Sequence, residues 1–244
     1  MKPKVSVIVP VYNSERSLQE LYQQLSQVLP QVSSSWEIIL VDDGSQDGSY
    51  RQMQQLRQID PRVKLIQLDG NFGQQNALLC GFQFASGDIW VTLDDDLQHP
   101  PEELPKLMTK LEEGYEAVFG IPNQKQHSGV RNLGSQVIDL LLTLIAHKPR
   151  SIKVSSFRVL NNRVGQAILN EDVSFVYLAP LIFRNTRCTA NVIVRHEPRK
   201  FGRSNYSYGK LLKLAFKLVF FYSGLARFFP SPKGPQYKIR NILR

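Results

Sequence analysis

The side chains of this sequence that are best suited to chemistry are three consecutive carboxylates, Asp94, Asp95 and Asp96. They follow an apolar run over residues 89–93 and precede a pair of prolines. Clustered carboxylates repel one another, and their desolvation is costly unless a cation neutralises them. Their hard oxygen atoms suit Mg²⁺ or Mn²⁺, which commonly bind a phosphate or diphosphate. The cluster predicts a divalent-cation site, although Asp96 alone could instead cap a following helix.

Polar residues also follow two earlier apolar runs. Residues 5–9 are followed by Pro10-Val11-Tyr12-Asn13, and residues 36–41 by Asp42-Asp43-Gly44-Ser45. In parallel sheets, ligands collect at the carboxyl ends of the strands. We therefore expect these polar groups to lie at the same edge of one sheet as the three aspartates.

The elements that must position these groups alternate between strand and helix patterns. Strands are predicted over residues 5–9, 36–41, 63–68, 89–93, 117–121, 154–160 and 191–195, and helices over 17–29, 48–59, 74–85, 104–111, 131–147 and 208–229. Such alternation predicts an α/β fold with a mostly parallel sheet, right-handed crossovers and flanking helices.

Two of the predicted helices are unusually apolar. The helix over 131–147 is too short and too closely flanked by charge to span a membrane, so it either packs in the core or inserts at a membrane surface. In the helix over 208–229, Lys210, Lys213 and Lys217 share one stripe. This pattern is typical of an interfacial helix lying in anionic headgroups, and also fits a core helix with a solvated lysine face.

Charge is unevenly distributed along the chain. The formal net charge is +9, and after residue 125 the only acidic residues are Asp139, Glu171, Asp172 and Glu197. A basic second half favours a phosphate-bearing partner, either a lipid surface or a nucleic acid. The acidic strand ends would repel nucleic acid, so we expect an anionic membrane surface and no nucleic acid. Because no signal peptide precedes the first strand, we expect a cytoplasmic protein peripherally associated with the inner face of the membrane.

Four separated motifs occur together in a recognisable order. They are Val7-Ile8-Val9-Pro10-Val11-Tyr12-Asn13, Ile38-Ile39-Leu40-Val41-Asp42-Asp43-Gly44-Ser45, Asn71-Phe72-Gly73 and Asp94-Asp95-Asp96-Leu97-Gln98-His99-Pro100-Pro101-Glu102. Over about residues 4 to 229 the chain resembles family 2 glycosyltransferases, and within them the polyprenyl-phosphate glycosyltransferases. The resemblance implies a Rossmann-like GT-A domain over residues 1–207. The apolar and charge patterns predict an amphipathic helix over 208–229, either interfacial or packed on the core, and a basic tail over 230–244.

The resemblance also implies roles for the strand-end residues. Nucleotide binding is implied for Pro10, Tyr12, Asn13, Glu15, Asp42, Asp43, Asn71, Gly73 and Asp95, with Asp42 as the acceptor for the base. Asp94 and Asp96 match the Asp-x-Asp motif of the family, and with Gln98 they would hold Mg²⁺ or Mn²⁺. Asp95 stands where relatives usually have alanine.

For the acceptor, the resemblance assigns phosphate binding to Arg131 and Arg199. The implied reaction moves a sugar from a UDP or GDP donor to a polyprenyl phosphate, with metal dependence and inversion at the anomeric carbon. A lipid phosphate is already ionised near neutral pH, so it needs positioning more than deprotonation.

Two alternatives remain open at this point. An inverting glycosyltransferase acting on a glycan hydroxyl would need a general base, for which Asp172 is the candidate. Glu171 and Asp172 are equally consistent with a loop or cap pair. A non-enzymatic protein that binds lipid or nucleic acid would explain the net charge of +9 but not the acidic strand ends.

Overall fold

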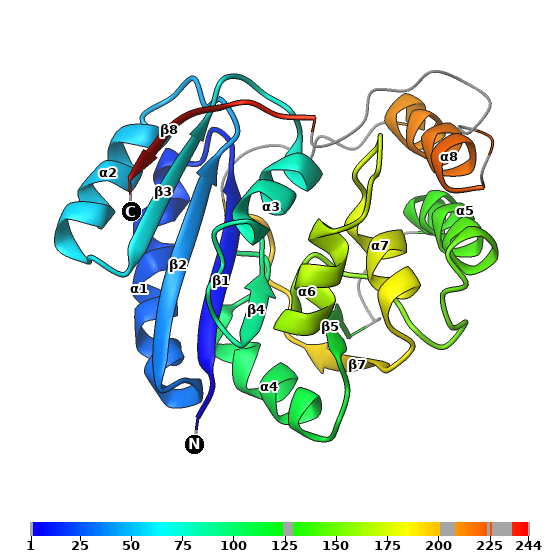
Figure 1. The fold of residues 1–244 in the computed structure, drawn as a ribbon, viewed down its shortest axis with the longest axis horizontal. Helices are drawn as coiled ribbons and strands as arrows, with labels where there is room; N and C mark the ends of the chain where they lie inside the picture. Colours follow the sequence, from blue (N-terminus) through cyan, green and yellow to red (C-terminus); the bar gives the residue numbers. More distant parts are fainter. Residues whose placement is uncertain (1, 124–128, 201–207, 224, 226–235, 244) are drawn as a thin grey trace.

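A mixed sheet forms the centre of the molecule (Figure 1). The computed structural model describes residues 2–123, 129–200, 208–223, 225 and 236–243, with the backbone alone for residues 129–135, 208 and 210. The strands in this part of the chain are β1 (Lys4–Val11), β2 (Ser35–Asp42), β3 (Val63–Leu68), β4 (Ile89–Thr92), β5 (Ala117–Pro122), β6 (Arg158–Asn161), β7 (Thr189–Val194) and β8 (Ile239–Leu243). Their order across the sheet is β7-β5-β6-β4-β1-β2-β3-β8.

Strand directions confirm the predicted mostly parallel α/β sheet. β1 is parallel to β2 and β4, β2 is parallel to β3, and β5 is parallel to β7. β6 runs antiparallel between β4 and β5, and β8 is antiparallel to β3. Central strands such as β1 are buried on both faces, which explains why their sequences are nearly continuous apolar runs.

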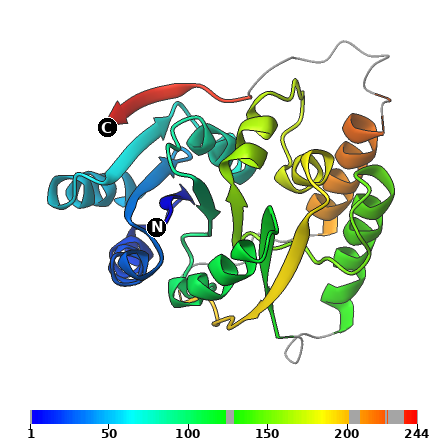
Figure 2. The ribbon, with the colours of Figure 1, turned by 60° about the horizontal axis from the view of Figure 1, so that its bottom comes forward.

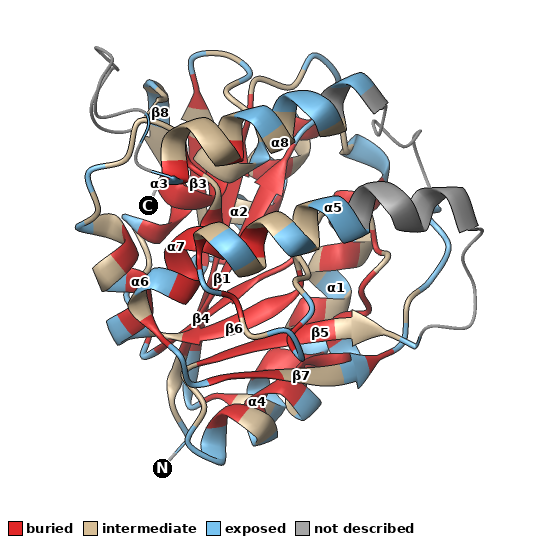
Figure 3. Ribbon diagram, turned by 90° about the vertical axis from the view of Figure 1, so that its right-hand side faces the viewer, coloured by how far each residue is buried: buried red, intermediate tan, exposed pale blue. Residues whose placement is uncertain are grey.

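Helices cover both faces of this sheet. They are α1 (Glu15–Val32), α2 (Ser49–Ile59), α3 (Gln74–Phe82), the 3-10 turn η1 (Pro101–Glu103), α4 (Leu104–Glu112), α5 (Gly129–Ile145), α6 (Asn162–Leu169), α7 (Leu178–Asn185) and α8 (Tyr208–Tyr222). Helices α1, α2 and α4 pack on one face, and α3, α6 and α7 on the other. Helices α5 and α8 lie side by side beyond α7, as Figure 3 shows.

The segment between β6 and β7 contains two helices that the sequence patterns did not predict. Helix α6 begins where the Asn161 side chain accepts a hydrogen bond from the Val164 amide at 3.0 Å, which is an ordinary N-cap. It lies so close to the sheet that a Cβ atom at Gly165 would be 2.1 Å from Trp90 Cε3. Helix α7 is only eight residues long and its first six residues are buried, so its short apolar run cannot be told from a strand by pattern alone.

Several predicted boundaries also differ from the structure. β6 begins at Arg158 rather than at residue 154, because Ser155 and Ser156 enter a polar cleft instead of the sheet. Helix α3 ends at Phe82 rather than at residue 85. Helix α8 ends at Tyr222, and residues 226–229 of the predicted helix lie outside the described residues.

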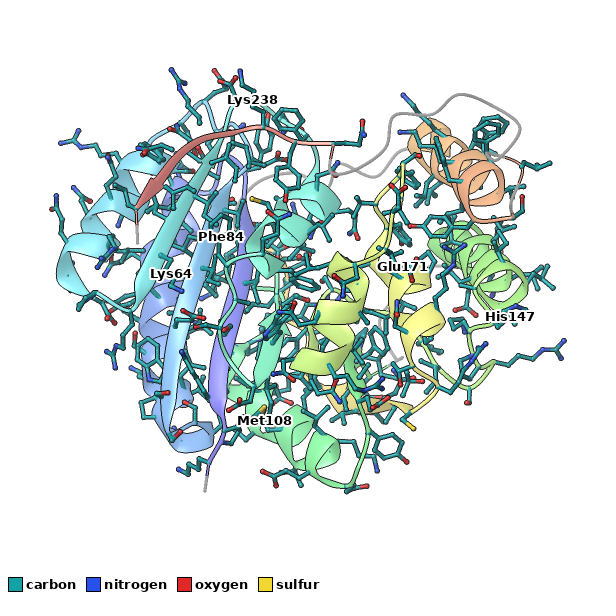
Figure 4. The ribbon with its side chains drawn as sticks, in the orientation of Figure 1. Lys64, Phe84, Met108, His147, Glu171 and Lys238 are labelled. Atoms are coloured by element: carbon teal, nitrogen blue, oxygen red, sulfur yellow. The ribbon has the colours of Figure 1, made fainter. Side chains whose placement is uncertain are left out.

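The C-terminal residues form a sheet strand, whereas the sequence pattern had indicated only a basic tail over 230–244. β8 pairs with β3 at the edge of the sheet opposite β7, as the view in Figure 2 shows. Next to the strand, the Asp69 amide donates to the Lys238 carbonyl at 2.8 Å, and the Lys238 ammonium pairs with the Asp69 carboxylate at 3.0 Å (Figure 4). Backbone pairing across the edge of the sheet, which is a long-range contact, therefore holds this segment.

Candidate active site

A cleft of about 1500 Å³ opens at the edge of the sheet where β1, β2 and β4 end. β6 starts at this same edge because it runs antiparallel to β4, with Arg158 opposite Thr92. The three predicted aspartates and Gln98 all line the cleft. The expected gathering of polar strand ends is therefore present in the fold.

The Asp94 carboxylate lies deep in this cleft and is held by neutral donors. Ser156 Oγ donates to it at 2.7 Å, and the Gln74 side-chain amide donates to its other oxygen. Burial raises the pKa of Asp94 to about 6, and the nearby Asp96 carboxylate adds to the rise. Its negative charge is thus only partly compensated by the protein.

The Asp95 side chain turns toward the loop after β1. Its carboxylate accepts a hydrogen bond from the Tyr12 amide at 3.2 Å. Burial raises the pKa of Asp95 to about 7, with the Asp94 and Asp96 charges contributing in the same direction. Asp95 therefore connects the predicted nucleotide wall to the predicted metal segment.

Among the residues that the structure describes, Asp96 is the aspartate of the three whose carboxylate pairs with a cation. It accepts from Arg199 Nη2 at 2.7 Å and from the Gln98 amide at 3.0 Å. The Gln98 side-chain amide nitrogen lies 3.3 Å from His196 Nε2. Arg199, which the resemblance assigned to phosphate, is therefore engaged by a predicted metal ligand.

This donor set fits Mg²⁺ or Mn²⁺ only together with a substrate. Among the described residues, no three His, Cys, Asp or Glu side chains converge to form a metal site by themselves. Magnesium, however, is usually bound by one or two carboxylates, with phosphate oxygens and water completing its coordination. The hard oxygens of Asp94, whose charge is only partly compensated, and of Asp96 meet that requirement.

Six of the nine residues assigned to nucleotide binding line the cleft: Pro10, Tyr12, Asp43, Asn71, Gly73 and Asp95. Asp43 fixes the loop after β3, because its carboxylate accepts from the Phe72 amide at 2.7 Å and the Gly73 amide at 2.9 Å. Burial raises the pKa of Asp43 to about 6, and this effect outweighs the two hydrogen bonds, which by themselves lower the pKa.

The other three nucleotide candidates brace the turn after β2 and are not among the residues that line the cleft. Asn13 Oδ1 accepts from the Gln46 amide at 2.7 Å, and Glu15 Oε2 accepts from the Gly48 amide at 3.2 Å. Asp42, the predicted acceptor for the base, is fully buried and accepts from the Ser45 amide at 3.0 Å. These contacts shape the turn, and the assignment of the three residues to nucleotide binding stays a prediction.

Two residues that were predicted to act on the acceptor, Arg131 and Asp172, are not among the residues shown to line the cleft. Arg131 lies on α5, and its side chain is outside the described residues. Asp172 is exposed and does not line the cleft, and its neighbour Glu171 accepts from Asn185 Nδ2 at 2.7 Å. The hydroxyl-activating candidate is therefore not among the residues that line the cleft with the aspartates.

Arg158 and His99 line the cleft but were not predicted to do so. Arg158 donates from Nε to Thr92 Oγ1 at 3.0 Å, and burial lowers its pKa to about 10, so it stays charged at neutral pH. His99 packs against His196. Burial, and to a lesser extent the charge of His196, lowers the pKa of His99 to about 4, so its ring is neutral near pH 7. A charged residue within the apolar run of β6 was the available sequence signal for Arg158.

One end of the cleft is apolar and reaches α8. Phe175, Val176 and Tyr177, which precede α7, line it together with Leu214 of α8. Phe175 packs against Phe221 of α8, with ring centroids 5.6 Å apart.

Helices α5 and α8 expose apolar side chains on the outside of the molecule. Leu212 and Phe216 of α8 are 73% and 70% exposed, and Leu140 and Leu144 of α5 are 56% and 64% exposed. Leu218 of α8 is buried, so the helix has one face in the core and another exposed. None of the described helices combines the length and apolarity needed to cross a membrane.

Comparison with known sequences identifies related proteins. The model of the family "Glycosyl transferase family 2" matches residues 6–171. Undecaprenyl-phosphate 4-deoxy-4-formamido-L-arabinose transferase from Salmonella choleraesuis (strain SC-B67) is 36% identical over 219 residues, covering 88% of this chain and 66% of the relative. The transferase of the same name from Salmonella newport (strain SL254) gives the same identity and coverage. This chain thus spans 66% of the length of these relatives.

Comparison with solved structures supports the fold. Glucosyl-3-phosphoglycerate synthase from Mycobacterium tuberculosis superposes with a TM-score of 0.63 at 18% identity, covering 94% of this chain and 82% of the synthase. A structure of that synthase with Mn²⁺ and uridine-diphosphate-glucose gives a TM-score of 0.63 at 17% identity, covering 98% and 86% of the two chains. These similarities confirm the predicted GT-A architecture.

Proposed function

The chain belongs to glycosyl transferase family 2, and from this membership we propose that it moves a sugar from a nucleoside diphosphate to a polyprenyl phosphate. The observation that carries the proposal is a single cleft containing the β4 aspartates, the loops after β1 and β3, and an apolar end at α8. The relatives named for undecaprenyl phosphate support this acceptor class. The synthase solved with uridine-diphosphate-glucose supports a nucleotide-sugar donor, with UDP or GDP as the carrier.

In this proposal Asp94 and Asp96 hold Mg²⁺ or Mn²⁺, with Gln98 beside them. Such an ion, when bound, neutralises charge on a diphosphate leaving group. Ser156 and Gln74 fix the orientation of Asp94 through their hydrogen bonds. Tyr12 offers a ring face for the base, and Asp43 positions Asn71 and Gly73 at the donor side.

The acceptor phosphate is its own nucleophile. Because it is ionised near neutral pH, the cleft has to orient it rather than deprotonate it. Attack on the anomeric carbon from the side opposite the diphosphate inverts that centre. With a pKa of about 4 His99 is a weak base, and Asp172 is not among the residues that line the cleft, so both agree with a reaction that uses no general base.

We place this reaction at the cytosolic face of a membrane. Exposed apolar side chains on neighbouring α5 and α8 are suited to the boundary between headgroups and acyl chains. Lys213 on the exposed part of α8 and the net charge of +9 favour an anionic surface. Because Leu214 joins α8 to the cleft, a lipid acceptor held there could reach the aspartates without leaving the surface.

The alternative of a glycan hydroxyl acceptor requires a base at the reaction centre. Asp172, the candidate for that base, is exposed and outside the cleft lining. A non-enzymatic binding role gives no reason for a buried, repulsive carboxylate cluster in the cleft. Both alternatives therefore explain fewer of the observed contacts.

A direct test compares two carboxylate variants in a sugar-transfer assay with undecaprenyl phosphate, nucleotide sugars and Mn²⁺. Asp96→Ala should lower kcat/KM by at least about a hundredfold, equivalent to about 2.7 kcal/mol, because a metal ligand is lost. Asp172→Asn removes an exposed carboxylate and should retain the wild-type rate. Full activity of Asp96→Ala would refute the metal role, and collapse of Asp172→Asn would favour the hydroxyl acceptor.

A further inference from the structure

Arg158 presents an unusual charge to the cleft. The residue is only 3% exposed, yet it is among the cleft-lining residues. Its one hydrogen bond within the described part of the chain runs from Nε to Thr92 Oγ1 at 3.0 Å. The two terminal nitrogens have neither a hydrogen bond nor an ion pair to any described residue, and they are not sealed inside the protein. They therefore face the cleft as free donors.

A desolvated guanidinium without a partner is costly, because burial removes its hydration without replacing it. Asp94 is close enough to stabilise the charge, but it does not form an ion pair with Arg158 and is already bound by Ser156 and Gln74. Arginine does not escape the cost by losing its proton near neutral pH. The arrangement is thus suited to an anion that enters from the cleft.

The surroundings of Arg158 indicate what else that anion carries. Asp94 is close to Arg158, and the β4 aspartates repel an anion unless a cation is bound. Tyr177 is also close to Arg158, and its neighbours Phe175 and Val176 line the same cleft together with Leu214 of α8. An anionic group at Arg158 would therefore share the cleft with apolar side chains that extend to α8.

We propose that Arg158 binds the phosphate group of the polyprenyl phosphate acceptor, with the isoprenoid chain passing Phe175 and Leu214. This assignment rests on the proposed function. Two parallel nitrogen donors of one guanidinium match two oxygens of a phosphate and fix its orientation. Arg199, the other described candidate, is bound to Asp96 at 2.7 Å and is therefore less available.

The donor diphosphate offers the same oxyanion chemistry, so the experiment must separate the two sources. We would measure KM for undecaprenyl phosphate at saturating donor, and the calorimetric affinity for UDP or GDP with Mn²⁺, in Arg158→Gln and Arg158→Lys. Arg163→Gln is the matched control, because Arg163 lies five residues along, is exposed and pairs with Glu116. Geranyl phosphate and geraniol, as soluble competitors, test the phosphate separately from the hydrocarbon.

In Arg158→Gln, KM for the acceptor should rise by at least about thirtyfold, since a buried charge pair is lost. Arg158→Lys should show a smaller rise in this KM, because lysine keeps the positive charge but lacks the two parallel N–H donors of the guanidinium. Nucleotide affinity should stay within about twofold of wild type, as should all parameters of Arg163→Gln. Geranyl phosphate should compete in wild type and not in Arg158→Gln, and geraniol should compete weakly in both.

An unchanged acceptor KM in Arg158→Gln would overturn the inference, as would an equal fall in nucleotide affinity, which would assign Arg158 to the donor. If Arg158→Gln does not fold, Arg158→Lys carries the test: an unchanged acceptor KM in that variant overturns the inference. Failure of the wild-type chain to transfer sugar to undecaprenyl phosphate would instead overturn the proposed function. The two failures are therefore distinguishable.

Discussion

The three aspartates after β4 each have a different neighbour. Asp94 is held by Ser156, Asp95 by the Tyr12 amide and Asp96 by Arg199. Only the last of these is a full positive charge, so the burial of Asp94 and Asp95 raises their pKa values to about 6 and about 7. The cluster remains strained when all three carboxylates are ionised.

This strain predicts the pH dependence of stability without divalent cations. The pKa of Asp95 is about 7 in the folded chain against an ordinary value of 3.8, so the folded form binds the proton more tightly. Stability should therefore fall as pH rises from about 4 through about 7. Calorimetry in EDTA between about pH 5 and 8 should show a fall in Tm that is larger, by about 2–4 °C, in wild type than in Asp95→Asn.

Asp172→Asn serves as the control for this measurement, because Asp172 is exposed. Its Tm should follow the wild-type curve. If Tm fell equally with pH in wild type and in Asp95→Asn, ionisation of Asp95 would not be the cause of the pH dependence.

Among the elements, β8 has a consequence for the donor side of the cleft. The loop that follows β3 is fixed by hydrogen bonds from its Phe72 and Gly73 amides to the Asp43 carboxylate. At its start, the Asp69 amide donates to the carbonyl of Lys238, which lies beside β8. Gly44 adds a third restraint: its φ of 75° favours glycine, and a Cβ there would lie 2.6 Å from the Gly70 carbonyl carbon. The donor loop therefore depends on a strand that is distant in the sequence.

Removing residues 236–244 should loosen this loop and lower the free energy of unfolding, because β3 loses one of its two neighbouring strands and keeps only β2. We expect the affinity for UDP or GDP with Mn²⁺ to fall by about tenfold, equivalent to about 1.4 kcal/mol. Calorimetric titration measures the affinity, and thermal unfolding measures the stability.

Lys238→Ala is the matched control, because it removes only an ion pair whose lysine side chain is 77% exposed. Such pairs contribute about 0–1 kcal/mol, so nucleotide affinity should hardly change. Wild-type nucleotide affinity in the truncated chain would show that the loop is fixed without β8.

At the scale of the whole molecule, the cleft reaches α8, which packs beside α5 and has an exposed outer face. Leu214 lines the cleft, while Leu212 and Phe216 on the same helix point outward. A membrane surface against α5 and α8 would thus lie next to the proposed acceptor site.

The double variant Leu212→Ser and Phe216→Ser should bind anionic liposomes at least about tenfold more weakly than wild type, because each large apolar side chain contributes about 1.5–3 kcal/mol when buried. Sedimentation with the liposomes measures the bound fraction. Ile59→Ser is the matched control, since Ile59 is 68% exposed but lies at the end of α2. Equal binding by all three proteins would refute the interfacial role of α8.

The sequence by itself determined the sheet of parallel strands and the position of the aspartates. Apolar runs such as those of β1 and β4 and the helical period of α1 are local patterns, and strands that alternate with helices leave few possible topologies. The four motifs likewise identified the family before any contact was known. These inferences needed only residues that are close together in the chain.

Only the tertiary structure decided which polar groups face the cleft. The side chains of Asp42 and Asn13 accept hydrogen bonds from the turn after β2. Arg158, in contrast, reaches the cleft because β6 runs antiparallel beside β4. The pairing of β8 with β3 has the same origin. Burial and strand pairing depend on contacts between residues that are far apart in the chain, and the local sequence pattern does not contain that information.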